Sequence, residues 1–159
     1  MTLLPVPRRL VQIAVAGGGA CSPRTAALAR AVGRALAAAG AVLVCGGLGG
    51  VMEAAARGAA ESGGTVIGIL PGYDHRDANR WVTVALPTGL GHARNVLVAA
   101  AGDALIALPG QHGTLAEVAL ARVLGRPVVA LGRKRDVSGV VAASTAEEAV
   151  RRALALARR

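Results

Sequence analysis

Short apolar runs alternate along the chain with segments whose apolar residues recur at a helical spacing. The runs predict buried parallel strands and lie at 10–16, 41–45, 65–70, 104–108 and 128–131. Between the first two runs, Leu28, Val32 and Leu36 share one helical face. This alternation predicts an α/β fold, a single-domain Rossmann-like, doubly wound parallel sheet with helices on both faces. It would span residues 10–159, after an N-terminal arm at 1–9.

Capping and breaking residues set the expected limits of the helices. Ser22 is placed as an N-cap before Pro23, and that helix should stop at Gly40. Further helices are expected at 51–62, 88–101 and 114–124, and a terminal helix should follow a capping box of Ser144 and Glu147. A short strand is expected at 81–86, and the polar segment 71–80 is the expected mobile lid.

Three of the expected strand-to-helix turns are rich in glycine, at 17–19, 46–50 and 110–113. Ligands of an open α/β sheet bind at the carboxyl ends of its strands, where such turns gather. The turn at 110–113 precedes a helix whose first N–H groups lack intrahelical partners and whose dipole is positive at that end. The sequence therefore predicts a phosphate-binding cradle, with Glu117 one helical turn away.

The net charge of the chain does not alter the predicted fold or ligand site. The net charge is +9 and comes almost wholly from arginine, with clusters at 133–135 and at Arg151, Arg152, Arg158 and Arg159. A basic surface can attract nucleic acid. However, the chain has no Phe, one Trp and one Tyr, so no aromatic residues interleave with the basic ones to stack on bases. Nucleic acid is the least favoured partner.

The chain shows neither a membrane span nor the order of charge, apolar run and cleavage site that marks a signal peptide. We expect a cytoplasmic protein in which Cys21 and Cys45 are reduced thiols. The polar residues Asp74, His75 and Asp77 are expected to be solvated, and no metal site is predicted.

Several common motifs are missing. The first glycine-rich turn lacks the third glycine of GxGxxG, the second has no GK[ST], and there is no GxSxG elbow. Decarboxylation through a pyridoxal phosphate Schiff base is rejected too, because Lys134, the only lysine, lies in a basic loop after a strand.

Three segments together resemble the Lonely Guy superfamily: 46–52 (GGLGGVM), 91–95 (GHARN) and 109–117 (PGQHGTLAE). The superfamily includes phosphoribohydrolases that activate cytokinins, proteins mislabelled as lysine decarboxylases, and molybdenum cofactor carriers. Gln111 replaces a glycine of its PGGxGTxxE motif, and Asn95 stands where the hydrolases carry lysine. Glu53 likewise replaces a glycine of the hydrolases, and the sequence of residues 69–95 is more similar to that of the carrier branch.

The resemblance implies a catalytic pair, Arg94 and Glu117, and a small phosphorylated ligand. Hydrolysis of the N-glycosidic bond of a purine nucleoside 5′-monophosphate is the favoured reaction, and no cofactor is required for it. The alternative is a non-catalytic protein that carries the molybdenum cofactor, a pterin phosphate. A homodimer or homotetramer is expected. The expected phosphate- and ligand-binding residues are Gly17, Gly18, Gly19, Ser22, Gly46, Gly47, Gly49, Gly50, His92, Asn95, Pro109, Gly110, Gln111, His112, Gly113 and Thr114.

Overall fold

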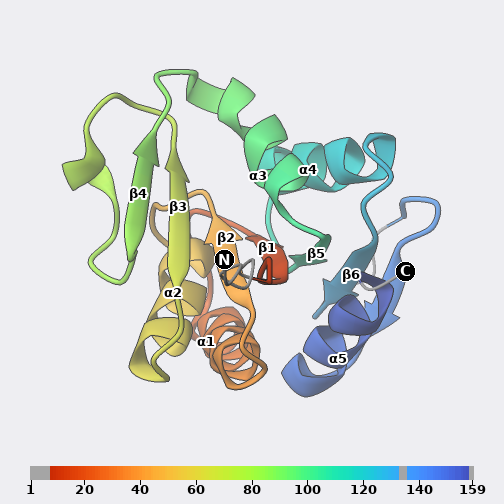
Figure 1. Ribbon diagram of the computed structural model, residues 1–159. Coiled ribbons are helices and arrows are strands. Elements are labelled where there is room, and N and C mark those ends of the chain that lie inside the picture. The colour runs from red at the N-terminus through yellow and green to blue at the C-terminus, as the bar shows by residue number, and fades with distance from the viewer. Residues whose placement is uncertain (1–7, 133–135, 158–159) are drawn as a thin grey trace, which may run out of the picture.

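Seven strands form one parallel sheet in the computed structural model, which describes residues 8–132 and 136–157 (Figure 1). The strand order is β4-β3-β2-β1-β5-β6-β7. The strands are β1 (Gln12–Ala16), β2 (Val42–Cys45), β3 (Val66–Leu70), β4 (Val84–Pro87), β5 (Ala104–Ala107), β6 (Val128–Leu131) and β7 (Val141–Ala143). The architecture confirms the predicted α/β, Rossmann-like class.

Helices cover both faces of this sheet (Figure 1). One face carries α1 (Pro23–Ala38), α2 (Val51–Glu61) and α5 (Ala146–Ala157), and the other carries α3 (Asn95–Ala101) and α4 (His112–Val123). Two 3-10 turns, η1 (His75–Asp77) and η2 (Gly91–Arg94), lie in the connections on either side of β4. From β1 the sheet grows through β2, β3 and β4 on one side, and β5, β6 and β7 are then added on the other side. The strand order therefore reverses between β1 and β5. Such a reversal opens a crevice at the carboxyl ends of the two strands.

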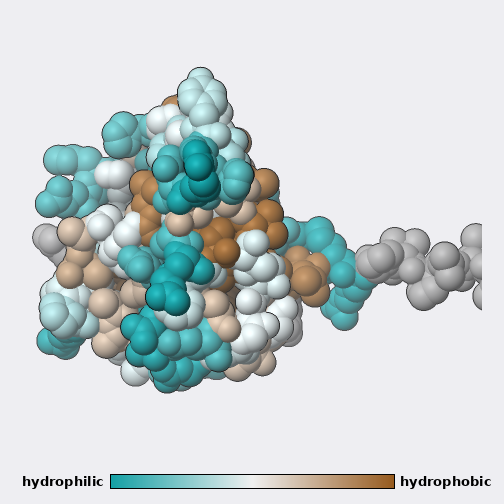
Figure 2. Space-filling model, turned by 90° about the vertical axis from the view of Figure 1, so that its left-hand side faces the viewer, coloured by the Kyte–Doolittle hydropathy of each residue, from teal (hydrophilic) through white to brown (hydrophobic). Residues whose placement is uncertain are grey.

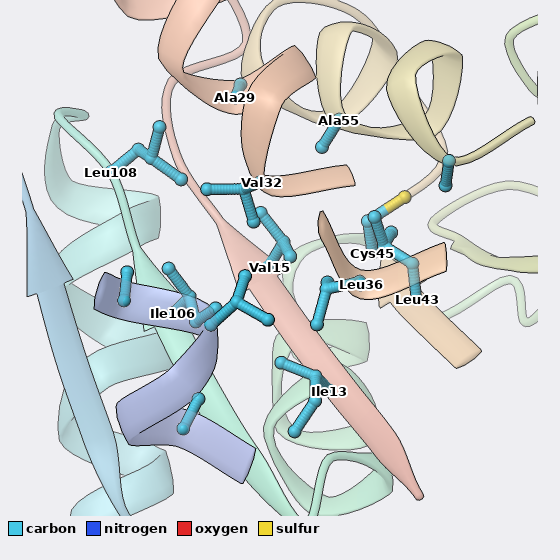
Figure 3. Close-up of a cluster of buried hydrophobic side chains, with 14 of the residues drawn as sticks. Ile13, Val15, Ala29, Val32, Leu36, Leu43, Cys45, Ala55, Ile106 and Leu108 are labelled. Atoms are coloured by element: carbon cyan, nitrogen blue, oxygen red, sulfur yellow. The ribbon is translucent and has the colours of Figure 1, made fainter. Parts of the chain in front are cut away.

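The core under α1, α2 and α5 is built from aliphatic side chains. Ile13, Val15, Leu43 and Ile106 point from the central strands toward Val32 and its neighbours on the helices (Figure 3). Glycine brings two of these helices together: a Cβ on Gly33 of α1 would overlap the Ala55 carbonyl of α2. Close backbone packing of this kind explains how a chain without phenylalanine fills its core.

Several expected element limits are wrong, each for a local reason. The helix expected from residue 88 begins only at η2, because Gly89 and Gly91 adopt positive φ values of 67° and 58°. The strand expected at 81–86 is shifted to Val84–Pro87, and the three-residue β7 has no counterpart in the predicted elements.

The cap of α5 is also displaced by one residue. The Thr145 hydroxyl, not that of Ser144, accepts the Glu148 backbone N–H at 3.1 Å. The Glu148 carboxylate in turn accepts the Ser144 N–H at 2.8 Å. The predicted cap of α1 is confirmed, because the Ser22 side chain accepts the Thr25 N–H at 3.1 Å.

Candidate functional site

A cavity of about 320 Å³ lies where β1 and β5 end side by side. We call it the β1–β5 cavity. Four sequence segments meet in it: the loop after β1, the start of α2, the η2–α3 junction, and the turn that leads from β5 into α4. Its lining residues are Gly17, Gly18, Gly19, Ala20, Met52, His92, Arg94, Asn95, Gly110, Gln111, Gly113, Thr114 and Glu117. The volume suits a small ligand rather than a macromolecule.

The start of α4 supplies the polar floor of this cavity. The first intrahelical bond runs from the Leu115 N–H to the Gln111 carbonyl, so His112, Gly113 and Thr114 precede it. Their N–H groups have no acceptor within the helix, and Gln111 makes no side-chain cap bond. These donors point outward at the positive end of the helix dipole, which is the arrangement that binds phosphate.

Glycine keeps this cradle open. A Cβ on Gly110 would overlap the Thr114 hydroxyl and lie 2.8 Å from the Gly18 backbone nitrogen. The Gly18 N–H itself donates to the Pro109 carbonyl at 3.0 Å, and the Val51 N–H donates to the Gly18 carbonyl at 2.9 Å. The loop after β1 is thereby fixed between the β5 turn and the first residue of α2.

Arg94 is buried at the edge of the cavity, with 8% of its surface exposed. Its Nε donates to the Ile69 carbonyl at 2.9 Å, one Nη donates to the Asn95 side-chain oxygen, and the other donates to the Gly46 carbonyl at 3.4 Å. The guanidinium therefore ties η2 to the ends of β2 and β3. The position of this guanidinium explains why residue 46 is a glycine, because a Cβ there would lie 2.6 Å from an Arg94 nitrogen.

Glu117 faces the same cavity from α4 and is 7% exposed. Burial raises the pKa of its carboxyl group to about 7, and the nearby Arg94 charge opposes that rise only in part. A substantial share of Glu117 is therefore protonated at neutral pH, and this form can donate a hydrogen bond. By contrast, burial raises the pKa of the Cys45 thiol to about 11, so this group stays a thiol.

The structure brings eleven of the predicted site residues together in the cavity lining given above. The other seven lie outside that lining: Ser22, Gly46, Gly47, Gly49, Gly50, Pro109 and His112. Several of these shape the surrounding turns: Ser22 caps α1, Pro109 holds Gly18, and a Cβ on Gly50 would overlap the Gly18 carbonyl. Sequence reasoning missed Ala20 and Met52, which line the cavity. Met52 is the second residue after the glycine-rich turn 46–50, and this proximity could have indicated its place in the site.

The segment 71–80 is held at one end by Asn79. Its side-chain amide donates to the Leu48 carbonyl at 2.9 Å, and its backbone N–H donates to the Gly47 carbonyl at 2.8 Å. A lid role for the segment stays a prediction. Within it, the Asp74 carboxylate is engaged by Arg76 at 2.7 Å. Over residues 8–132 and 136–157, no three His, Cys, Asp or Glu side chains gather in a way that could hold a metal ion.

Other features bear on the remaining expectations. Cys21 and Cys45 are free cysteines. None of the helices in the described part of the chain is long and apolar enough to cross a membrane. The basic residues at 133–135, Arg158 and Arg159 lie outside the described residues, as do residues 1–7 of the expected N-terminal arm.

Solved structures match this fold along almost the whole chain. A molybdenum cofactor binding protein from Rippkaea orientalis is 34% identical, with a TM-score of 0.88 over 94% of this chain and 99% of that one. The molybdenum cofactor carrier protein of Chlamydomonas reinhardtii is 33% identical, with a TM-score of 0.85 over 94% and 99%. DNA processing protein A from Helicobacter pylori, at 20% identity and a TM-score of 0.70 over 91% and 80%, shares the fold alone.

Sequence relatives point the same way. An uncharacterized protein from Archaeoglobus fulgidus is 42% identical over 89% of this chain and 93% of its own length. A cytokinin riboside 5′-monophosphate phosphoribohydrolase from Rhodococcoides fascians is 39% identical over 57% of this chain and 48% of its own. These matches confirm the resemblance to the Lonely Guy superfamily. The model of the SLOG cluster4 family matches residues 10–157, and the chain belongs to that family.

Proposed function

We propose that this protein binds a phosphorylated pterin, the molybdenum cofactor, and holds it without turnover. The proposal rests on the hydrogen bonds of Arg94, whose guanidinium donates to three oxygens of the protein itself. The full-length similarity to molybdenum cofactor binding and carrier proteins supports the same ligand. The cofactor is cargo in this account, and the protein supplies the binding surface.

The phosphate of the ligand would lie on the first turn of α4. Backbone N–H groups of Gly113 and Thr114 are available there, and the Thr114 side chain is nearly buried beside Gly110. Glu117 adds an acid that is protonated in part at neutral pH. In that form it donates to an anionic or carbonyl oxygen, whereas a carboxylate would repel it.

Asn95 acts through Arg94 in this account. The Asn95 side-chain oxygen accepts from one Arg94 nitrogen, and the Ile69 and Gly46 carbonyls accept from the others. The two carbonyl bonds hold the guanidinium against the ends of β2 and β3, and the Asn95 bond fixes its orientation. Arg94 thus holds the wall of the cavity in place, and its positive charge favours an anionic ligand at short range.

Hydrolysis is the second candidate, because Arg94 and Glu117 lie in one buried cavity as the hydrolase pattern requires. A pKa of about 7 suits an acid or base at neutral pH. Departure of a purine base from a nucleoside 5′-monophosphate would leave an oxocarbenium-like ribose. Glu117 would then stabilise that cation or activate water, and Arg94 would orient the phosphate or the base.

Two assays on the intact protein separate these functions. Chromatography measures free base released from AMP and its N6-substituted analogues, and a binding titration measures affinity for molybdopterin. The carrier function predicts no released base and saturable molybdopterin binding, which Glu117→Gln retains because glutamine also donates a hydrogen bond. Base release that Glu117→Gln abolishes, without molybdopterin binding, would establish the hydrolase instead.

We further propose a homodimer or homotetramer that assembles through the face bearing α3 and α4. Val96 and Leu97 of α3 and Leu115 of α4 expose 36%, 38% and 45% of their surfaces. The edge strand β4 adds Val84 and Leu86, which pair with Ile67 and Ile69. Viewed from the β4 side, hydrophobic surface lies between hydrophilic areas (Figure 2). Burying such apolar surface favours association.

Light scattering tests this assembly. Leu97→Glu should shift the mass to that of one chain, because a charge would be buried at the contact. Leu10→Glu is the matched control, since Leu10 is 59% exposed and lies beside α1 and α5 rather than α3 and α4. A wild-type mass of one chain would refute the assembly.

A cytoplasmic location remains part of this proposal, and the two free cysteines support it.

A further inference from the structure

A second cavity, of about 650 Å³, adjoins the β1–β5 cavity. We call it the Trp81 cavity, after one of its walls. It lies between α1 and α2, and Gly19 and Ala20 line both cavities. The two are therefore neighbouring compartments on either side of one loop. The β1–β5 cavity is the smaller of the two.

Consecutive residues at the start of α2 serve the two compartments. Met52 lines the β1–β5 cavity, and Glu53 lines the Trp81 cavity. Glu53 is exposed, and it forms no hydrogen bond or ion pair with another residue in the described part of the chain. Its carboxylate is therefore available to accept hydrogen bonds from a ligand. This is also a position at which the sequence departs from the hydrolase pattern.

Trp81 and Arg57 also line the Trp81 cavity, and Arg57 follows Glu53 by one turn of α2. Arg57 and Arg80 stack on the Trp81 ring, with their guanidinium carbons 5.6 and 5.0 Å from its centroid. Arg57 is held there by Glu61, whose carboxylate lies 2.8 Å from the Arg57 Nε and 2.6 Å from an Arg30 nitrogen. Planar aromatic and guanidinium groups are the surfaces on which nucleobases stack.

The loop at Gly19, which lines both cavities, leaves room for a group that links them. A Cβ built on Gly19 would meet no atom within 4 Å, so the space above that residue is open. A pyrophosphate that crosses Gly19 would have the phosphate cradle of α4 on one side and the arginines of the Trp81 cavity on the other.

We propose that the Trp81 cavity binds a guanine base, so that the complete ligand is a pterin dinucleotide. The pterin half would occupy the β1–β5 cavity, and a pyrophosphate would cross Gly19. Guanine presents two adjacent N–H donors on its pairing edge, which match the two oxygens of the Glu53 carboxylate. This inference rests on the proposed function, because it extends the pterin phosphate that the first cavity binds.

Titrations with molybdopterin and with molybdopterin guanine dinucleotide test it on the full chain. Trp81 is the only tryptophan, so its fluorescence reports directly on the second cavity. The dinucleotide should quench Trp81 and bind roughly tenfold more tightly than molybdopterin, as expected for a hydrogen bond to a charged group. Glu53→Gln should remove that preference and leave molybdopterin affinity unchanged. Glu147→Gln, an exposed glutamate in the first turn of α5, is the matched control.

The outcomes separate this inference from the proposed function. If molybdopterin binds, but the dinucleotide binds no more tightly and Glu53→Gln changes neither affinity, the guanine site is overturned and the carrier function stands. If neither compound binds, both are overturned.

Discussion

Replacing Glu117 by glutamine should change how the stability of the fold depends on pH. Burial raises the pKa of the folded carboxyl group from 4.5 to about 7. The folded state thus holds its proton more strongly than the unfolded state does. The contribution of Glu117 to stability is therefore greatest below pH 4.5 and falls as the pH rises toward 7, because ionisation of this carboxyl group then favours the unfolded chain.

The full difference between the two pKa values corresponds to about 3 kcal/mol. Between pH 5 and pH 8 the wild-type protein should lose about 2 to 3 kcal/mol of unfolding free energy relative to Glu117→Gln. Urea denaturation of both proteins at several pH values measures this change. Working at constant ionic strength keeps the screening of other charges equal.

Glu61→Gln provides a control with the opposite sign. Hydrogen bonds from Arg57 and Arg30 lower the pKa of Glu61, so its contribution to stability is lost only as the pH falls below about 4.5. The difference between wild type and Glu61→Gln should accordingly stay constant from pH 5 to pH 8. Parallel pH profiles for the wild type and Glu117→Gln would refute the buried, protonated state of Glu117.

Three further substitutions, two of them with a paired control, test the site and the fold. Arg94→Lys should lower the unfolding free energy by about 2 kcal/mol, because one ammonium cannot satisfy three separated buried oxygens, and unchanged urea denaturation would contradict this role. Gly110→Ala should cost about 1 to 3 kcal/mol and weaken phosphate binding, whereas Gly113→Ala, whose Cβ would meet only one atom at 4.0 Å, should melt at or above the wild-type temperature. Thr145→Ala should cost about 1 kcal/mol through the lost cap of α5. Ser144→Ala should be nearly neutral in the same thermal melts, and equal losses would contradict the assigned cap.

The sheet was predictable because its strands are almost entirely apolar. Runs such as 104–108 are buried on both faces, and no other element suits so short an apolar stretch. β7 was not predictable, since its three residues are only partly covered and lack that pattern. The limits near Gly89 and Gly91 depend on positive φ angles, which the composition of a segment does not specify.

The phosphate cradle was predictable from its local sequence, because a strand, a glycine-rich turn and a helix start define it. The role of Arg94 was not. Its partners are the carbonyls of Ile69 and Gly46, which lie 25 and 48 residues away in the chain. Only the folded sheet brings those oxygens next to η2. The Trp81 cavity escapes sequence reasoning for the same reason, since α1, α2 and Trp81 meet only in three dimensions.

A crystal structure of the protein with molybdopterin tests the central claim most directly. We expect density for the phosphate over the first turn of α4, within hydrogen-bonding distance of the Gly113 and Thr114 N–H groups. The pterin should lie in the β1–β5 cavity, with Arg94 still bonded to the Ile69 carbonyl. A phosphate bound away from this turn, or an Arg94 side chain released from Ile69 to contact the ligand, would contradict it.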